Sequence, residues 1–162
     1  MSSVLKIIDQ INKFLLILMG IFMGIMSVVI IFQVFSRFFL GFPLPWSEEL
    51  ARFLMIYTVF IGAALALRQQ KLISIEVIAE NISARARRIL KTTANAIGIV
   101  FFIILFLKGI EVTSQVYGQV SAAMRLPMSY AYAALPLGAV FLTMNAVAVI
   151  IEMYTETEEV ES

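Results

Sequence analysis

The sequence predicts an all-α integral membrane protein with four transmembrane helices. Of its 162 residues, 61% are hydrophobic and only 14% are charged, whereas soluble domains carry about 25% charged residues. The mean hydropathy is +0.96. A soluble domain of this size could not bury so much apolar surface, so lipid is the expected solvent. Long windows without charged residues divide the chain, and we expect a single membrane domain over residues 1–162.

The windows without charged residues place the four spans. Phe14–Phe35 and Leu126–Ile151 are each long enough for a spanning helix, which needs about 20 apolar residues. Phe53–Leu67 and Thr92–Leu107 reach that length if the flanking Arg and Lys side chains extend to the lipid headgroups. The first window is longer than the apolar region of a signal peptide, so we expect a membrane anchor. The expected spans are approximately 14–36, 47–68, 90–112 and 128–151, followed by an acidic, frayed tail at 152–162.

The basic residues predict the orientation, because loops rich in Lys and Arg remain in the cytoplasm. The N-terminal segment and the connection between the second and third spans contain most of them, so we expect both termini to be cytoplasmic. In that connection, Ile75, Ile78 and Ile82 follow helical spacing. This spacing predicts a short amphipathic helix at the cytoplasmic interface. The residues on the expected cytoplasmic side are Lys6, Lys13, Arg68, Lys71, Arg85, Arg87, Arg88 and Lys91, against Arg37, Arg52, Lys108 and Arg125 on the other side.

The residue types that are missing exclude several functions. The chain has no His and no Cys, which excludes disulfides, thiolate metal sites, His-ligated haem and a Ser-His-Asp triad. No charged residue lies deep in an expected span, although ion-coupled carriers usually need an intramembrane carboxylate or a broken-helix ion site. We therefore expect no catalytic, substrate-binding or metal residue, no cofactor, and a role as a partner subunit. The polar residues expected to link helices within the membrane are Gln33, Thr58, Asn95, Thr143 and Asn145.

Small residues and a proline indicate where helices pack closely. Gly20 and Gly24 form a GxxxG pair in the first span, and Ala94 and Gly98 repeat that spacing in the third, which allows helices to approach. The neighbouring helix could belong to this chain or to another protein. Pro136 lies inside the fourth span and is followed by Gly138. A proline within a helix frees a carbonyl and usually kinks the helix, and we expect a structural role for it here.

A charged cluster follows the first span. Ser47 is expected to cap the second helix, with Glu48 and Glu49 in its first turn, where the helix dipole favours anions. Helical spacing would pair both carboxylates with Arg52. Two interpretations remain open: a well-capped helix with paired surface charges, or a docking surface for a partner. The other members of the cluster are Arg37, which could reach either carboxylate, and Trp46, which fits an interfacial aromatic belt.

These residues carry a resemblance to a known family. The strings FSRFF at 35–39, WSEELARF at 46–53 and IGAALALR at 61–68, which includes Gly62 and Arg68, resemble the small membrane subunit of tripartite ATP-independent periplasmic (TRAP) transporters. The strings LPM at 126–128 and ALPLG at 134–138 are similar to the final span of that family. The match covers nearly the whole chain. The chain departs from the family at QQKLI, 69–73, where relatives often have a short basic stretch containing His.

The resemblance implies a non-catalytic scaffold in a bacterial or archaeal inner membrane. Its implied partners are a large multi-helix TRAP membrane subunit, which would hold substrate and sodium, and a periplasmic substrate-binding protein. The implied process is sodium-driven uptake of an organic acid anion, such as a dicarboxylate, sialic acid or another sugar acid. We also expect the chain to contact the lipid bilayer. We expect no nucleic-acid partner.

Two other functional classes compete with this expectation. A homo-oligomeric four-helix exporter or channel would need polar residues along a shared path, and the spans contain few of them. An intramembrane enzyme would need a base beside a serine or a set of metal ligands, and the sequence contains no obvious arrangement of either kind.

Overall fold

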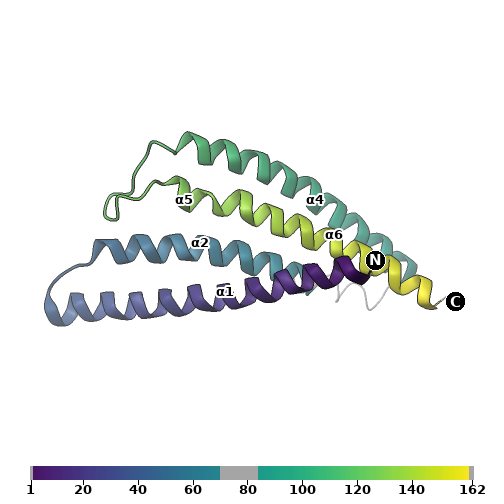
Figure 1. Cartoon of the computed structure of the whole chain (residues 1–162), viewed down its shortest axis with the longest axis horizontal. Coiled ribbons are helices and arrows are strands. Elements are labelled where there is room, and N and C mark those ends of the chain that lie inside the picture. The colour runs from purple at the N-terminus through teal and green to yellow at the C-terminus, as the bar shows by residue number, and fades with distance from the viewer. Residues whose placement is uncertain (1, 70–83, 161–162) are drawn as a thin grey trace.

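The computed structural model describes residues 2–69 and 84–160, and these residues form four long helices that run antiparallel along the chain (Figure 1). The described part also contains one isolated β-bridge, between Val120 and Pro127. The all-α prediction is therefore confirmed. In chain order the elements are α1 (Ser2–Phe35), the π-helical turn η1 (Ser36–Leu40), α2 (Pro45–Arg68), α4 (Ala84–Gln115), the short helix α5 (Ser129–Tyr132) and α6 (Ala134–Val160).

Within the described residues, four helical stretches are long and apolar enough to cross a membrane, which confirms the predicted number of spans. The predicted interfacial helix around 75–82 lies outside the described residues. The four stretches are Val4–Leu40, Pro45–Arg68, Ile89–Gln115 and Ser129–Met153.

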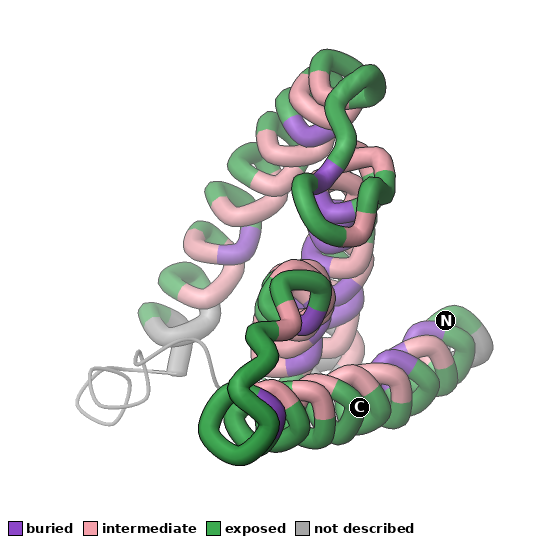
Figure 2. The backbone as a smooth tube through the Cα atoms, turned by 90° about the vertical axis from the view of Figure 1, so that its left-hand side faces the viewer, coloured by how far each residue is buried: buried purple, intermediate pink, exposed green. Residues whose placement is uncertain are grey.

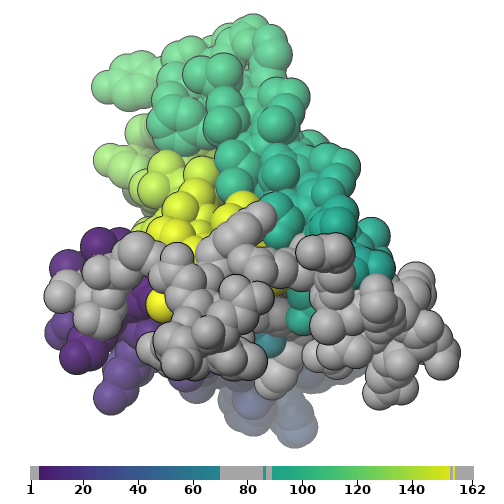
Figure 3. Space-filling view, turned by 90° about the vertical axis from the view of Figure 1, so that its right-hand side faces the viewer, coloured from purple at the N-terminus to yellow at the C-terminus, as the bar shows by residue number. Residues whose placement is uncertain are grey.

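Helices α2 and α6 form the centre of the bundle, while α1 and α4 lie on its two sides. Helix α6 packs against α4 and α2, and α1 packs mainly against α2. Figure 2 shows the buried residues concentrated on the central helices. Figure 3 shows the C-terminal part of α6 between the first residues of α1 and those of α4. The spans differ in the share of their most apolar stretch that is buried inside the bundle. That share is 44% for the fourth span but only 6% for the first. Helix α1 therefore presents most of its apolar surface outward.

Two apolar clusters hold this arrangement together. Ala64 and Leu67 of α2 meet Leu142 and Ala146 of α6, and Phe102 of α4 packs against them. A second cluster joins α1 to α2, with Leu15 of α1 against Ile61 and Leu65 of α2. Because α2 contributes to both clusters, it connects the outer helix α1 to the α4–α6 pair.

Close helix approach occurs at two glycines of the second half of the chain. A Cβ atom on Gly138 would lie 2.6 Å from the Phe60 ring, so α2 and α6 touch there. A Cβ atom on Gly109 would lie 2.9 Å from Pro136, so α4 and α6 also touch. Pro136 lies inside the fourth span, as expected, but it does not lie in the middle of a continuous helix. The fourth span is divided at Ala133, and Pro136 lies in the first turn of α6, where a missing N–H is tolerated.

A buried amide pair links three helices at the end of the bundle that holds both termini. The side chains of Asn12 and Asn145 donate to each other at 2.7 and 2.8 Å. Asn145 also donates to the carbonyl of Ala64 at 2.8 Å, and Asn12 donates to that of Ile8 at 2.9 Å. Since Asn145 is fully buried, these bonds form without competition from water and fix the position of α1, α2 and α6 relative to one another.

An ion triad reinforces the same end of the bundle. Arg68, the last residue of α2, donates to Asp9 of α1 at 3.0 Å and binds both carboxylate oxygens of Glu152 of α6. The expectation of a frayed acidic tail is wrong for Glu152, because α6 continues to Val160 and Glu152 pairs with Arg68. The termini of α1 and α6 are thus attached to the end of α2.

Three of the polar residues expected to link helices do not do so. The hydroxyls of Thr58 and Thr143 donate to carbonyls of their own helices, Leu54 and Ala139. The amide of Asn95 likewise donates to Lys91 one turn earlier. A Thr or Asn side chain on a helix can bond the carbonyl four residues before it, so its polarity alone does not predict a link between helices.

We expect Asn145→Leu to lower the free energy of unfolding by about 1–3 kcal/mol, because it leaves Asn12 and the Ala64 carbonyl without a partner in a buried position. Unfolding of the full chain in mixed micelles, titrated with sodium dodecyl sulfate, measures this change. The matched control is Thr143→Val on the same helix, whose hydroxyl bonds only its own helix. Equal losses for the two variants would contradict the linking role of Asn145.

We expect Gly138→Ala to destabilise the chain by about 1–3 kcal/mol, because the added methyl group would overlap the Phe60 ring and force α2 and α6 apart. Gly24→Ala is the control, since nothing lies within 4 Å of the Cβ position there. The same micelle titration compares the two. If Gly138→Ala is as stable as the natural chain, the helices do not meet at this glycine as described.

Candidate functional site

The chain reverses direction between α1 and α2 through a compact turn. η1 ends at Leu40, and the next residue, Gly41, has a φ of 69°, in the left-handed region that glycine adopts without strain. The buried hydroxyl of Ser36 donates to the Phe42 carbonyl at 2.8 Å, and the Ser36 carbonyl accepts the Phe42 amide at 3.3 Å. We call η1, residues 41–44 and the first two turns of α2 the α1–α2 corner. Its backbone is held by local bonds.

The predicted helix cap at Ser47 is wrong. Helix α2 begins at Pro45, and the capping position belongs to Leu44, which makes no capping bond with its side chain. Proline suits the first helical position because its φ is already helical and its missing N–H would have no partner there. The helix therefore begins before Ser47. The Ser47 side chain is buried and donates to the Leu44 carbonyl at 2.6 Å, which ties the first turn to the preceding segment.

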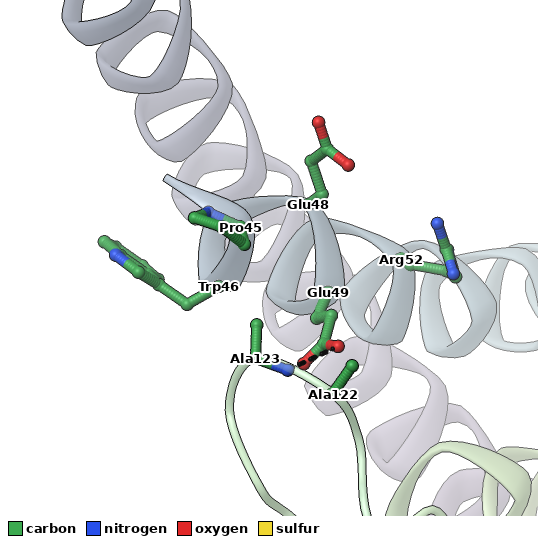
Figure 4. Close-up of a pocket in the computed structure, with 7 residues that line it drawn as sticks. All are labelled: Pro45, Trp46, Glu48, Glu49, Arg52, Ala122 and Ala123. Carbon is green, nitrogen blue, oxygen red and sulfur yellow. Dashed lines mark hydrogen bonds between the residues drawn. The ribbon is translucent and has the colours of Figure 1, made fainter. Parts of the chain in front are cut away.

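Two adjacent carboxylates make contacts on different sides of α2. Glu48 accepts a hydrogen bond from the side chain of Gln33 on α1 at 3.0 Å. Glu49 accepts the backbone amides of Ala123 and Met124, at 2.9 and 2.8 Å, from the loop that connects α4 to α5. Figure 4 shows Glu48 directed away from this loop and Glu49 directed toward it. The two residues thus attach α2 to α1 and to the second half of the chain.

The expected ion pairs of this cluster do not form. Among the described residues, neither Arg37 nor Arg52 forms an ion pair with Glu48 or Glu49, and both arginines are exposed. Neutral donors already bind the two carboxylates, which removes much of the gain from an ion pair at a wet surface. Glu48 and Glu49 both lie at the corner, as predicted, but their partners are Gln33 and the loop amides and not the two arginines.

Sequence reasoning missed the loop that Glu49 binds. In that loop the Ser121 amide donates to Leu126 and the Met128 amide donates to Gln119, both at 2.8 Å. Ser121 also accepts the Leu126 amide through its hydroxyl at 3.2 Å. Arg125 adopts a φ of 54°, unusual for a residue with a side chain. No sequence motif indicated that backbone amides 74 and 75 residues away would face Glu49.

An open groove lies where the corner meets this loop. Its volume is about 470 Å³, and Trp46, Glu48, Glu49, Arg52, Ala122 and Ala123 line it (Figure 4). Trp46 is 39% exposed and points outward at one edge, while Arg52 lies at the other. Among the described residues, no group of acidic side chains could hold a metal ion. A groove with an exposed indole at one edge and an exposed guanidinium at the other is suited to contact another macromolecule, because aromatic and Arg side chains are enriched in protein interfaces.

The other predicted residues lie apart from this groove. Arg68 belongs to the ion triad at the opposite end of α2. Gly62 faces Met19 of α1 at an ordinary contact distance of 3.5 Å, and Gly98 faces only Phe102 of its own helix. A Cβ atom on Gly20 or Gly24 would have nothing within 4 Å, so no described residue packs against the GxxxG surface of α1. Ala94 is half-buried on α4.

Comparisons with known proteins relate most of the chain to one family. Residues 26–156 match the family described as "Tripartite ATP-independent periplasmic transporters, DctQ component". The chain is 30% identical over 82 residues to the sialic acid TRAP transporter small permease protein SiaQ of Vibrio cholerae, a match that covers 51% of this chain and 46% of that protein. It is 26% identical over 114 residues to the sialic acid TRAP transporter permease protein SiaT of Haemophilus influenzae. That match covers 70% of this chain and 18% of SiaT. The chain thus spans less than half the length of these two relatives.

We expect Glu49→Gln to release the α4–α5 loop, because an uncharged side chain accepts backbone hydrogen bonds more weakly than a carboxylate does. Amide hydrogen exchange at Ala123 and Met124 should become severalfold faster, while exchange within α6 should not change. Glu48→Gln is the matched control, since Glu48 contacts Gln33 and not the loop. Unchanged exchange in the Glu49 variant would mean that the loop keeps its shape without this contact.

Proposed function

Because the chain belongs to the DctQ component family of TRAP transporters, we propose that it acts as the small membrane subunit of such a transporter. In this role it is a non-catalytic scaffold that holds a large substrate-translocating subunit in the membrane. The observation that carries the proposal is the match over residues 26–156, which includes three complete spans and part of the first. The whole chain acts as one membrane domain.

The distribution of charge supports a scaffold rather than a carrier. The ion pairs of the described residues lie near helix ends, at Arg68 with Asp9 and Glu152 and at Lys108 with Glu111. The buried side chains of Asn12 and Asn145 bind each other. A coupled carrier needs ionisable or ion-coordinating groups within the membrane. In our proposal, the large subunit provides those groups.

The outer face of α1 supports a docking role within the membrane. Gly20 and Gly24 lie one turn apart, and nothing in the described part of the chain lies within 4 Å of the Cβ position of either. Small residues at this spacing let two membrane helices approach closely. We propose that a helix of the large subunit packs there. The groove beside Trp46 and Arg52 is the proposed place for a transient contact with the periplasmic binding protein.

The names of the relatives suggest the substrate class. SiaQ and SiaT are named as sialic acid transporter proteins. We propose that the complex takes up an organic acid anion, such as sialic acid, another sugar acid or a dicarboxylate. Uptake is driven by a sodium gradient across the inner membrane of a bacterium or archaeon. Both termini of this chain face the cytoplasm, as the distribution of basic residues predicts.

Co-purification tests the subunit role. The tagged chain, extracted from native membranes in mild detergent, should bring down one large multi-helix membrane protein in stoichiometric amount, identified by mass spectrometry. Reconstituted with that protein and its binding protein, it should support uptake only with an inward sodium gradient. Recovery of the chain alone as a defined homo-oligomer, with solute flux in liposomes, would instead favour a channel or exporter.

We expect Gly24→Leu to reduce co-purification of the large subunit at least severalfold, because the larger side chain would keep a partner helix at a distance. The chain itself should fold normally, since Gly24 contacts no other helix of its own. Ala96→Leu, at an exposed position of α4, is the control and should co-purify as the natural chain does. Normal co-purification of the Gly24 variant would exclude this face as the contact.

A further inference from the structure

We propose that the α1–α2 corner binds the headgroup of a zwitterionic aminophospholipid, with its phosphate at Arg37 and its ammonium group at Glu48. The site is a second pocket, of about 480 Å³, on the α1 side of the corner. It is lined by Gln33, Arg37, Gly41, Pro43, Leu44 and Glu48. This inference goes beyond the proposed transport role and needs only that the chain spans a membrane.

The first argument is the pair of opposite charges within one pocket. Arg37 and Glu48 both line it, yet they form no ion pair with each other. Among the described residues, the Arg37 guanidinium has no partner. One Glu48 oxygen accepts the Gln33 amide at 3.0 Å, and the other makes no hydrogen bond there. A ligand with an anionic and a cationic group on a short linker could therefore bind both side chains at once.

The second argument is where the pocket lies. It sits where the first span ends and the second begins, which is where we expect the lipid headgroups to lie. The neighbouring phenylalanines Phe38, Phe39 and Phe42 are 78%, 76% and 70% exposed. So many exposed aromatic rings are unfavourable in water but are suited to contact acyl chains. A lipid would fill the polar pocket with its headgroup and cover these rings with its tails.

The charges also select among lipid headgroups. A phosphatidylethanolamine has a phosphate for Arg37 and an ammonium that can donate hydrogen bonds to Glu48. A phosphatidylcholine carries the same charges, but its methylated ammonium has no N–H to donate. A phosphatidylglycerol has the phosphate without a cation, so Glu48 would gain no partner and would repel the anion. The pocket should therefore prefer phosphatidylethanolamine to both.

Quenching of the single tryptophan tests this preference, because Trp46 follows Pro45 at the corner. The full chain is reconstituted in phosphatidylcholine bilayers that contain increasing fractions of one brominated lipid, either phosphatidylethanolamine or phosphatidylglycerol. Bromine quenches indole fluorescence at short range. The loss of Trp46 fluorescence with increasing brominated lipid therefore reports how strongly that lipid binds at the corner relative to phosphatidylcholine. We expect phosphatidylethanolamine to bind about fivefold more strongly than phosphatidylcholine, which is roughly the net contribution of one hydrogen bond.

Two variants separate the contributions of the charges. Glu48→Gln should remove the preference for phosphatidylethanolamine over phosphatidylcholine, because the ammonium loses its acceptor anion. Arg37→Gln should weaken binding of phosphatidylethanolamine and of phosphatidylglycerol. Lys108→Gln, an exposed lysine away from the pocket, is the control and should change neither. Circular dichroism confirms that each variant keeps its helical content.

Three results would overturn the proposal. One is equal binding of the three lipids by the natural chain. Another is a preference that persists in both the Arg37 and the Glu48 variants. The third is stronger binding of phosphatidylglycerol that depends on Arg37 alone, which would indicate a site for anionic lipid without a role for Glu48. If a variant loses its helical content, native mass spectrometry of the natural chain with the three lipids decides the order of affinity.

Discussion

The bilayer interior offers no water to a polar group, and this constraint explains where the polar contacts of the chain lie. The backbone is satisfied within long helices. The one buried polar contact that joins helices inside the described bundle, between Asn12 and Asn145, is complete in itself and also binds the Ala64 carbonyl. The ion triad of Arg68 lies near the helix ends, where water and headgroups are available. The position of α1, α2 and α6 at that end follows from these two contacts.

The opposite end of the bundle is joined in a different way. Glu48 and Glu49 are neighbours in sequence, yet one binds α1 and the other binds the loop before α5. Tyr57 adds a further connection, because its hydroxyl donates to the Tyr130 carbonyl at 2.6 Å. Helix α2 is therefore the element to which both ends of the fold are attached. This central position suits the scaffold role that we propose.

The outer helices leave large apolar faces for other molecules. A soluble protein could not keep the exposed surfaces of α1 and α4, whereas a membrane subunit can cover them with lipid or with partner helices. The proposed functions divide these surfaces. The glycine face of α1 is assigned to a partner helix, the groove beside Trp46 to a soluble partner, and the pocket at Arg37 to a lipid headgroup. Glu48 lines both the groove and the pocket, but Trp46 and Arg52 line only the groove and Arg37 lines only the pocket. Substitutions of those three residues can therefore alter one surface at a time.

The sequence by itself determined the fold class and the number of spans, because both depend on the length and apolar character of windows along the chain. It also indicated the family, through strings such as WSEELARF. Only the tertiary structure decided the partners of the polar residues. Spacing suggested that Arg52 would pair with Glu48 and Glu49, but their partners come from Gln33 and from a loop more than 70 residues away. Likewise, Asn145 links helices while Asn95 bonds its own helix. Local sequence fixes what a side chain can bind, but contacts between distant segments depend on how the helices pack.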